Sequence, residues 1–169
     1  IAQVVARYEA LRVRFQATDG GLRAILNSAD AFEIEQEDLR HLGSENALET
    51  AFKRAQEFCA QVNLIEGDWL TRAKVFALPG GESVGVISSA HMIADAGTRN
   101  IVIDEIHDIL DHGAPRAVAA GSYNDYALAE REFLAGPQGE ALIAHWRDWY
   151  HAQPTVKAPS DAAPLLWGN

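Results

Sequence analysis

The sequence predicts an α+β fold in which a mostly antiparallel sheet is backed by helices. Two kinds of apolar pattern support this prediction. Alternating or β-branched runs bounded by Gly and Pro turns indicate strands, and apolar residues three and four positions apart indicate helices. With 169 residues, of which 48% are hydrophobic and 22% charged, the chain is long enough to enclose one sizeable core.

The first third of the chain predicts a helix, a hairpin and an edge strand. Apolar residues at helical spacing open the chain with no capping residue ahead of them, so we interpret its start as truncated: Ile1, Val4, Val5, Tyr8 and Leu11. A short strand follows Arg12, and a turn at 19–21 leads into a second strand over 22–26. Residues 32–35 alternate Phe and Ile with two Glu, as in an edge strand with one solvated face.

A helix and a pair of strands are predicted in the middle of the chain. Asn46 and Glu49 have capping-box spacing, and an apolar stripe follows them: Leu48, Ala51, Phe52, Ala55, Cys59 and Val62. Because Cys59 lies on this stripe, we predict that it is a core residue, and as the single cysteine it excludes an internal disulfide. Strands over 69–78 and 83–91 follow, joined by a Pro-Gly-Gly turn.

The C-terminal half is predicted to be helical. A helix that begins near Asn100 and ends near Gly113 has one apolar face: Val102, Ile103, Ile106, Ile109 and Leu110. Ser122 and Asp125 have capping-box spacing and open another helix. A last helix follows Pro137 and carries Leu142, Ile143, Trp146, Trp149 and Tyr150. We expect its three aromatic residues to pack in a core rather than to form a ligand cage. The segment 153–169 contains three prolines without a period and indicates an extended linker.

Composition and charge exclude several classes of function. The formal net charge of -10 opposes binding to nucleic acid or to an anionic membrane, because both require a clustered positive surface. No apolar run approaches the roughly 20 residues that span a bilayer, and no signal-peptide pattern is present, so we expect a cytoplasmic protein. The acidic residues and histidines at 104–112 lack zinc-ligand spacing and indicate a solvated face, so we predict no metal site.

Candidate reactive side chains gather where the strand over 83–91 meets the next helix. His91 ends the strand, Asp95 follows four positions later, and Gly97 and Thr98 lead into the helix, with Thr98 as a candidate cap. A histidine titrates near neutral pH and suits proton transfer beside a fixed carboxylate. The structural alternative is a hydrogen-bonded core histidine followed by a helix-start aspartate. The serines before His91 lack a Gly-x-Ser-x-Gly context, which argues against a serine hydrolase.

Residues 90–96, Ala-His-Met-Ile-Ala-Asp-Ala, resemble the His-His-x-x-x-Asp-Gly motif of the condensation domains of nonribosomal peptide synthetases. The same motif occurs in their relatives, the chloramphenicol acetyltransferase-like, coenzyme A-dependent acyltransferases. Upstream, residues 7–15 resemble the family's Arg-His-Glu-x-Leu-Arg-Thr-x-Phe segment. Further family landmarks follow in the same order at 123–127, 145–147 and 158–161. The resemblance covers nearly the whole chain, and the ordered set is more specific than any one motif.

The resemblance implies a chloramphenicol acetyltransferase-like N-terminal lobe over 1–152 and a crossover linker over 153–169 that leads to a second lobe. Such proteins bind no metal or organic cofactor and join an acyl thioester to an amine or hydroxyl. The acyl group is carried on the phosphopantetheine of a carrier protein, the implied partner, or on coenzyme A. The resemblance makes His91 the catalytic residue, as base or as stabiliser of the tetrahedral intermediate. Asp95 is then structural and pairs with Arg12, and the backbone at Ala96 and Gly97 lies beside the substrate.

Two departures from the family motif leave alternatives open. Ala90 stands at the family's first histidine and Ala96 at its glycine, with Gly97 one place later. A non-catalytic docking platform for carrier proteins or tailoring enzymes is therefore the alternative to an acyltransferase, and an epimerising relative has the same motif. In either catalytic case we expect the isolated fragment to be inactive, because the family's reaction takes place between two lobes.

Overall fold

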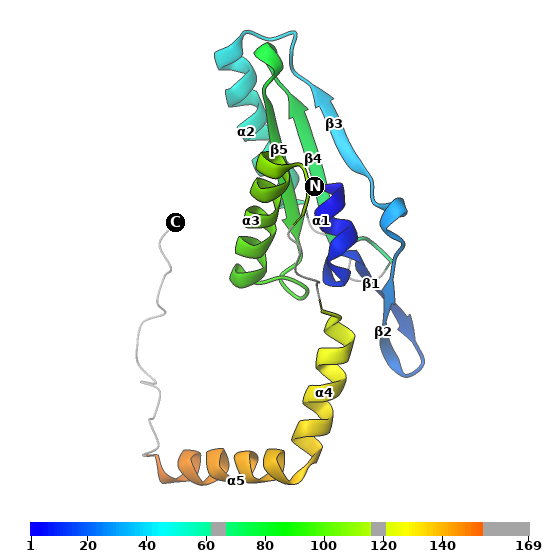
Figure 1. The fold of residues 1–169 in the computed structure, drawn as a ribbon, viewed down its shortest axis with the longest axis vertical. Helices are drawn as coiled ribbons and strands as arrows, with labels where there is room; N and C mark the ends of the chain where they lie inside the picture. Colours follow the sequence, from blue (N-terminus) through cyan, green and yellow to red (C-terminus); the bar gives the residue numbers. More distant parts are fainter. Residues whose placement is uncertain (62–66, 116–120, 154–169) are drawn as a thin grey trace, which may run out of the picture. The chain divides into compact units, whose positions relative to one another are not determined.

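The computed structural model describes residues 1–61, 67–115 and 121–153. The chain divides into two compact units, Ile1–Tyr123 and Asn124–Asn169. The first unit contains these elements in order: α1 (Ala2–Arg7), the 3₁₀ turn η1 (Glu9–Arg12), β1 (Val13–Thr18), β2 (Gly21–Leu26), η2 (Ala29–Ala31), β3 (Ile34–Asp38), α2 (Ser44–Ala60), β4 (Thr71–Ala77), η3 (Pro79–Gly81), β5 (Ser83–Ser89) and α3 (Ala96–His112) (Figure 1). The second is built on α4 (Tyr123–Ala135) and α5 (Pro137–Ala152). This mixture of helices and strands confirms the predicted α+β class.

The strands of the described residues form two sheets. β1 and β2 make the predicted antiparallel hairpin. The larger sheet has the order β3-β4-β5, with β4 and β5 antiparallel and β3 at an edge, as its alternating residues predicted. β3 runs parallel to β4, however, because α2 connects the two strands and returns the chain to the same end of the sheet. The prediction of mostly antiparallel pairing therefore holds for the hairpin and for β4–β5 but not for β3.

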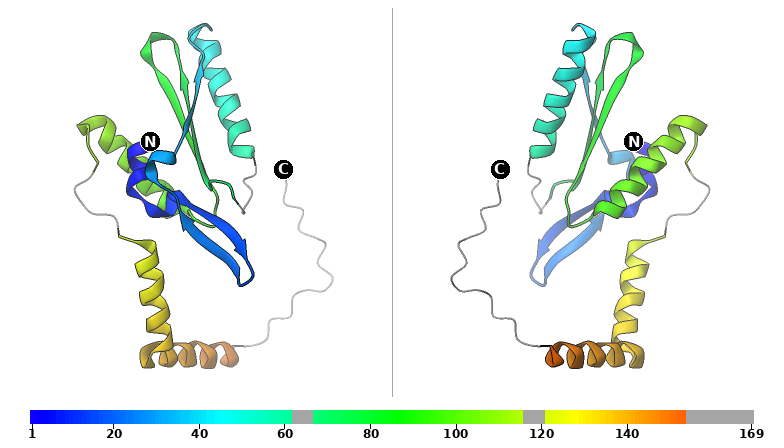
Figure 2. Two further views of the ribbon diagram at one scale, coloured as in Figure 1. Left: turned by 90° about the vertical axis from the view of Figure 1, so that its right-hand side faces the viewer. Right: turned by 90° about the vertical axis from the view of Figure 1, so that its left-hand side faces the viewer.

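Helices cover both faces of the three-stranded sheet. Side chains alternate between the two faces along a strand, so the β5 neighbours Val86 and Ile87 belong to different cores. The alanines of α2 pack on Phe76 on one face. Val5 of α1 and Val102 of α3 share a core with Ile87 on the other face. Figure 2 shows α2 on one side of the sheet and α1 and α3 on the other. The sheet is thus backed by helices, as predicted.

The backbone contacts at the two ends of β5 show which of its residues are hydrogen-bonded to β4. Ala90 N–H donates to the Leu70 carbonyl at 2.8 Å, and Leu78 N–H donates to the Glu82 carbonyl at 2.9 Å. Because hydrogen-bonded and non-bonded pairs alternate in an antiparallel ladder, the even-numbered residues of β5 bond to β4. The backbone groups of the odd-numbered residues, from Ser83 to Ser89, point away from β4.

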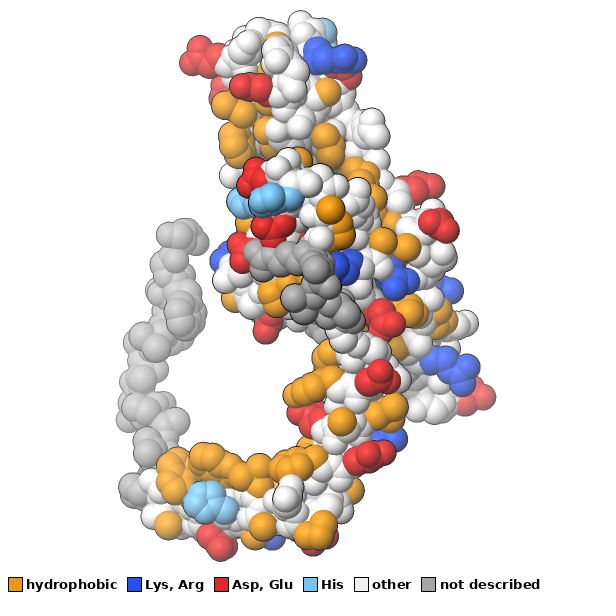
Figure 3. Space-filling model, viewed as in Figure 1, with side chains coloured by type: hydrophobic (Ala, Val, Ile, Leu, Met, Phe, Trp, Pro, Cys, Tyr) orange, Lys and Arg blue, Asp and Glu red, His pale blue; other side chains and the backbone are white. Residues whose placement is uncertain are grey.

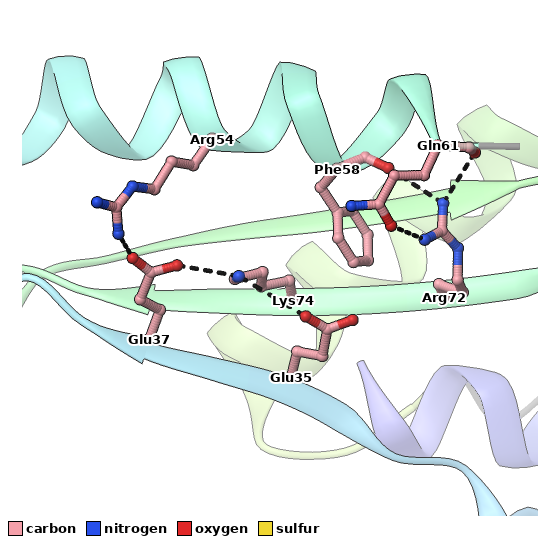
Figure 4. Close-up of polar contacts among 7 residues, drawn as sticks. All are labelled: Glu35, Glu37, Arg54, Phe58, Gln61, Arg72 and Lys74. Carbon is pink, nitrogen blue, oxygen red and sulfur yellow. Dashed lines mark hydrogen bonds and ion pairs between the residues drawn. The ribbon is translucent and has the colours of Figure 1, made fainter.

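Charged side chains connect β3, β4 and α2 (Figure 4). Lys74 of β4 lies 2.9 Å from a Glu37 carboxylate oxygen and 3.6 Å from one of Glu35, both on β3. Glu37 also pairs with Arg54 of α2. The Lys74 side chain is only 18% exposed, so its charge is balanced by these carboxylates rather than by solvent alone.

Arg72 holds the C-terminal end of α2 (Figure 4). Its guanidinium donates to the Phe58 carbonyl at 3.0 Å and to the Gln61 carbonyl at 3.1 Å, and it lies 4.7 Å from the centre of the Phe58 ring. The last carbonyls of a helix have no partner within the helix, and they form its negative end. Arg72 therefore supplies both hydrogen bonds and a complementary charge where α2 ends.

The face that α2 buries differs from the predicted one. The buried residues are Ala47, Ala51 and Phe58, while Phe52 is 57% exposed and Cys59 is exposed. The prediction that Cys59 is a core residue is therefore wrong. The small alanines let the helix approach the sheet closely. The helix then faces the sheet with Phe58, and the next residue, Cys59, points to solvent. The predicted capping box of Asn46 and Glu49 is wrong as well, because α2 begins at Ser44 after Gly43 with no side-chain cap. Val62, the last residue of the predicted stripe, lies outside the described residues.

The second unit contains two helices that meet at a tight corner. α4 ends at Ala135 and α5 begins at Pro137, as the Gly-Pro break predicted. Gly139 is buried at this corner, where an added Cβ would lie 2.4 Å from both the Phe133 carbonyl oxygen and the Leu134 Cα. Hydrophobic side chains follow α5 on the surface (Figure 3). Trp146 is 55% exposed, so the prediction that the α5 aromatics pack in a core is wrong.

Candidate active site

β5 delivers His91 to a turn that ends at the start of α3. The strand's pairing continues through Ala90, and Ile93 N–H then donates to the Ala90 carbonyl at 3.0 Å, which closes the turn. The His91 side chain is exposed, and none of the described residues donates a hydrogen bond to its ring or accepts one from it. The structural alternative, a hydrogen-bonded core histidine, is therefore wrong. Both ring nitrogens are therefore available for hydrogen bonds to a bound molecule.

Asp95 is the N-cap of α3, as the structural alternative has it; the prediction of Thr98 as the cap is wrong, because the helix begins at Ala96 rather than near Asn100. Its carboxylate accepts from the Thr98 backbone N–H at 2.7 Å and from the Thr98 hydroxyl at 2.8 Å, while Asp95 N–H donates to the same hydroxyl at 3.3 Å. These hydrogen bonds stabilise the charged carboxylate, the backbone bond most, and lower the pKa of Asp95 from its ordinary value. An added Cβ on Gly97 would lie 3.3 Å from the Asp95 carboxylate, so a bare Cα leaves room for the cap.

The predicted ion pair between Asp95 and Arg12 is wrong. Arg12 donates from Nη1 to the Asn27 carbonyl at 2.7 Å, and its neighbour Arg14 donates from Nε to the Asn27 side-chain oxygen at 3.0 Å. Both arginines thus hold the end of the β1–β2 hairpin. Asp95 lies exposed with the Thr98 N–H as partner, so no burial of its charge requires an arginine.

A hollow of about 960 Å³ lies between β5 and α3 and includes the His91 corner. Among the predicted site residues, His91, Asp95 and Ala96 line it, whereas Arg12 and Gly97 do not. Apolar side chains make up much of its wall, among them Val86 and Ile87 of β5 and Val102, Ile103, Ile106 and Leu110 of α3. An exposed histidine that lines a largely apolar hollow can act on a polar reacting group whose attached chain lies along the wall.

Arg99 and His107 line the hollow but are not among the predicted site residues, and the sequence analysis treats His107 only as part of the solvated face at 104–112. Both lie on the face of α3 that lines the hollow, since positions 99, 103, 106, 107 and 110 recur at helical spacing. Extending the predicted apolar stripe of α3 by one turn toward Asp95 identifies Arg99, and His107 lies four residues after Ile103 on the same stripe. The two residues add a positive charge and a second imidazole to the wall of the hollow.

The structure also bears on two other classes of site. In the described ranges 1–61, 67–115 and 121–153, no group of three or more His, Cys, Asp or Glu side chains is placed to hold a metal ion. Within those same ranges no helix has both the length and the apolar character to cross a membrane.

Comparisons with known proteins agree with the resemblance. Residues 1–166 match the condensation domain family. The chain is 27% identical over 164 residues to one of the linear gramicidin synthase proteins of Brevibacillus parabrevis, with 94% of this chain and 2% of that protein covered. It is 23% identical over 161 residues to malpinin synthetase of Mortierella alpina, with 92% and 2% covered.

Solved structures show the same fold. A structure described for condensation domain-mediated chain release from the enacyloxin polyketide synthase superposes with a TM-score of 0.81 at 33% identity and covers 96% of this chain. The condensation enzyme VibH superposes at 0.70 and 17% identity, over 91% of this chain. This chain spans 32% and 36% of those two structures, about a third of each. The fold, the placement of His91 after β5 and the match over residues 1–166 lead to one conclusion: the chain belongs to the condensation domain family.

Proposed function

We propose that this chain forms part of the N-terminal lobe of an acyltransferase of the condensation type, with His91 in the catalytic role. The reaction joins an acyl thioester, carried on phosphopantetheine of a carrier protein or on coenzyme A, to an amine or hydroxyl. The enacyloxin structure, whose description names condensation domain-mediated chain release, supports this class of reaction. The observation that carries the proposal is the exposed, unpartnered His91 ring at the mouth of the hollow between β5 and α3.

We assign two proton transfers to His91, one in each half of the acyl transfer. The acceptor nitrogen or oxygen attacks the thioester carbonyl, and its bond to carbon forms as His91 takes up the proton. The carbon–sulfur bond then breaks, and the proton passes to the leaving thiolate. A protonated His91 also stabilises the negative charge of the tetrahedral intermediate. Asp95 contributes by fixing the start of α3, because its carboxylate is engaged by Thr98.

A non-catalytic docking platform is the second candidate function, and a specific observation favours it. Ala90 and Ala96 replace the two motif positions that flank the His91 to Asp95 segment in the family resemblance. In a docking platform the hollow binds a segment of a carrier or tailoring protein, and His91 is only a surface residue. The two functions differ in what the loss of the imidazole does.

The test is His91→Ala in the complete domain that contains this chain, assayed with an acyl thioester on phosphopantetheine and an amine acceptor. We expect acyl transfer to fall on the order of 10²-fold or more, as for the loss of a general base. His112→Ala is the matched control, because His112 lies on the same helix, bonds to the Asp108 carbonyl and does not line the hollow. Full transfer by His91→Ala would favour the docking platform. The 169 residues alone are expected to show no turnover, since the proposed reaction needs the second lobe.

A further inference from the structure

Glu105 is a fully buried acid in the middle of the apolar stripe of α3. It is 1% exposed, and the stripe on either side of it consists of Val102, Ile106 and Ile109. From the helical periodicity alone, a hydrophobic residue would be expected at position 105. A buried charge is unfavourable unless it is paired, and the proposed chemistry does not use Glu105. Its presence calls for a role other than stabilisation.

Two side chains of the α1 region contact the Glu105 carboxylate. Arg7 Nε lies 3.2 Å from Oε1, and the Tyr8 hydroxyl donates to Oε2 at 3.2 Å. The Arg7 Nε–H is not aimed at Oε1, so this contact is a pairing of charges rather than a hydrogen bond. The Arg7 side chain is 17% exposed, which keeps both charges largely out of water. Each carboxylate oxygen thus has its own partner from a different residue.

These contacts fix one position and one rotation of α3 relative to α1. α1 has only six residues, too few to be stable as an isolated helix, so its position depends on its neighbours. An apolar stripe alone tolerates small rotations and shifts of a helix. A carboxylate held by two partners at 3.2 Å does not, because even part of one helical turn, which rises about 5.4 Å, lengthens both contacts. Buried ionic groups can fix register in this way at a cost in stability.

The position of α3 can affect the position of His91, because a short segment connects the two. Glu105 lies ten residues after Asp95, about 15 Å along a rigid helix. Asp95 is the N-cap, and the closed turn at Ala90 to Ile93 joins that cap to His91. A rotation or slide of α3 therefore moves the imidazole relative to β5 and changes the mouth of the hollow.

We propose that Glu105, with Arg7 and Tyr8, is a positioning residue that acts through α3 to set where His91 lies. The inference rests on the proposed function only in taking His91 as the functional side chain. Its decisive variant is Arg7→Met/Glu105→Leu, which replaces the ion pair with apolar side chains of similar volume and leaves no charge unpaired. Tyr8→Phe is the milder variant, since it removes only the contact at Oε2.

The primary measurement is the NMR signal of the His91 ring in the complete domain, which requires no catalysis. We expect the double variant to unfold at the same urea concentration as the native protein but to show a shifted or broadened His91 signal. Tyr8→Phe should move that signal in the same direction by less. The matched control is Ile109→Val, which lies on the same face of α3 and outside the hollow; it should lower stability and leave the His91 signal in place.

Activity provides the second measurement. A displacement of about 1 Å at a reacting group can lower turnover on the order of 10²-fold, so kcat should fall more than KM rises in the double variant. A native His91 signal in both the double variant and Tyr8→Phe would overturn the positioning role. If the native domain shows no acyl transfer, the proposed function fails, while the NMR comparison still decides the role of Glu105.

Discussion

Gly139→Ala should open the corner between α4 and α5. The added Cβ would lie 2.4 Å from the Phe133 carbonyl oxygen and from the Leu134 Cα, whereas ordinary contacts of a Cβ begin at 3.4 Å. The backbone must therefore move by about 1 Å, because neither obstacle is a side chain that can rotate away. Alanine normally stabilises a helix by about 1 kcal/mol over glycine, and overpacking costs about 1–3 kcal/mol. Because the obstacle is rigid backbone, we take the upper part of the overpacking range, about 2–3 kcal/mol; subtracting the helix gain of about 1 kcal/mol leaves a net loss of about 1–2 kcal/mol.

The assay for this variant combines amide hydrogen exchange in α4 and α5 with a distance between spin labels at the exposed positions Arg131 and Arg147. Gly139→Ala should speed exchange on both sides of the corner and lengthen or broaden the spin–spin distance. Gly136→Ala is the matched control, because its added Cβ would make contacts of 3.4 and 3.5 Å. Equal effects of the two substitutions, or an unchanged distance in Gly139→Ala, would refute the steric argument.

Two further outcomes follow from the contacts of Arg72 and Asp95. Arg72→Lys should weaken the last turn of α2 by about 1–2 kcal/mol, because lysine cannot reach two carbonyls with one planar group. The loss should be measured as faster amide exchange in that turn. Arg40→Lys is the control, since Arg40 belongs to an exposed ion pair and its replacement should change exchange little. Because hydrogen bonds lower the pKa of Asp95, its cap stabilises α3 above the unfolded-state value near 3.8 and is lost as pH falls through the lower folded value. The Thr98 amide shift should follow that transition in acid, and Asp95→Asn should abolish it; a pH-independent Thr98 amide in the native protein would contradict the cap.

Local patterns predicted the elements that carry the candidate site. The β4–β5 pair, its turn, and the core-facing residues of α3 such as Val102 and Ile106 follow from period and turn chemistry, which are properties of neighbouring residues. The same local pattern places His91 next to a strand end, although the predicted strand over 83–91 is two residues too long: β5 ends at Ser89, and His91 lies in the turn after it. These features do not depend on which distant segment packs against them.

Other features depended on packing between distant segments and could not be predicted in the same way. The parallel pairing of β3 with β4 is set by the path of α2 across the sheet, and no residue of β3 encodes it. The burial of Phe58 rather than Cys59 reflects how α2 rotates to bring its alanines onto Phe76. Asp95 had two plausible partners, and the one three residues away is the one that the structure shows.

The odd-numbered backbone groups of β5 have a consequence for how this strand can be extended. Among the described residues β4 is the only strand hydrogen-bonded to β5, so amide exchange along β5 should alternate, slow at Val84, Val86 and Ser88 and faster at Gly85 and Ile87. Any strand that joins this edge must bond to that odd set alone. A strand added along β5 as far as Ser89 would end two residues before His91, beside the hollow that both residues line.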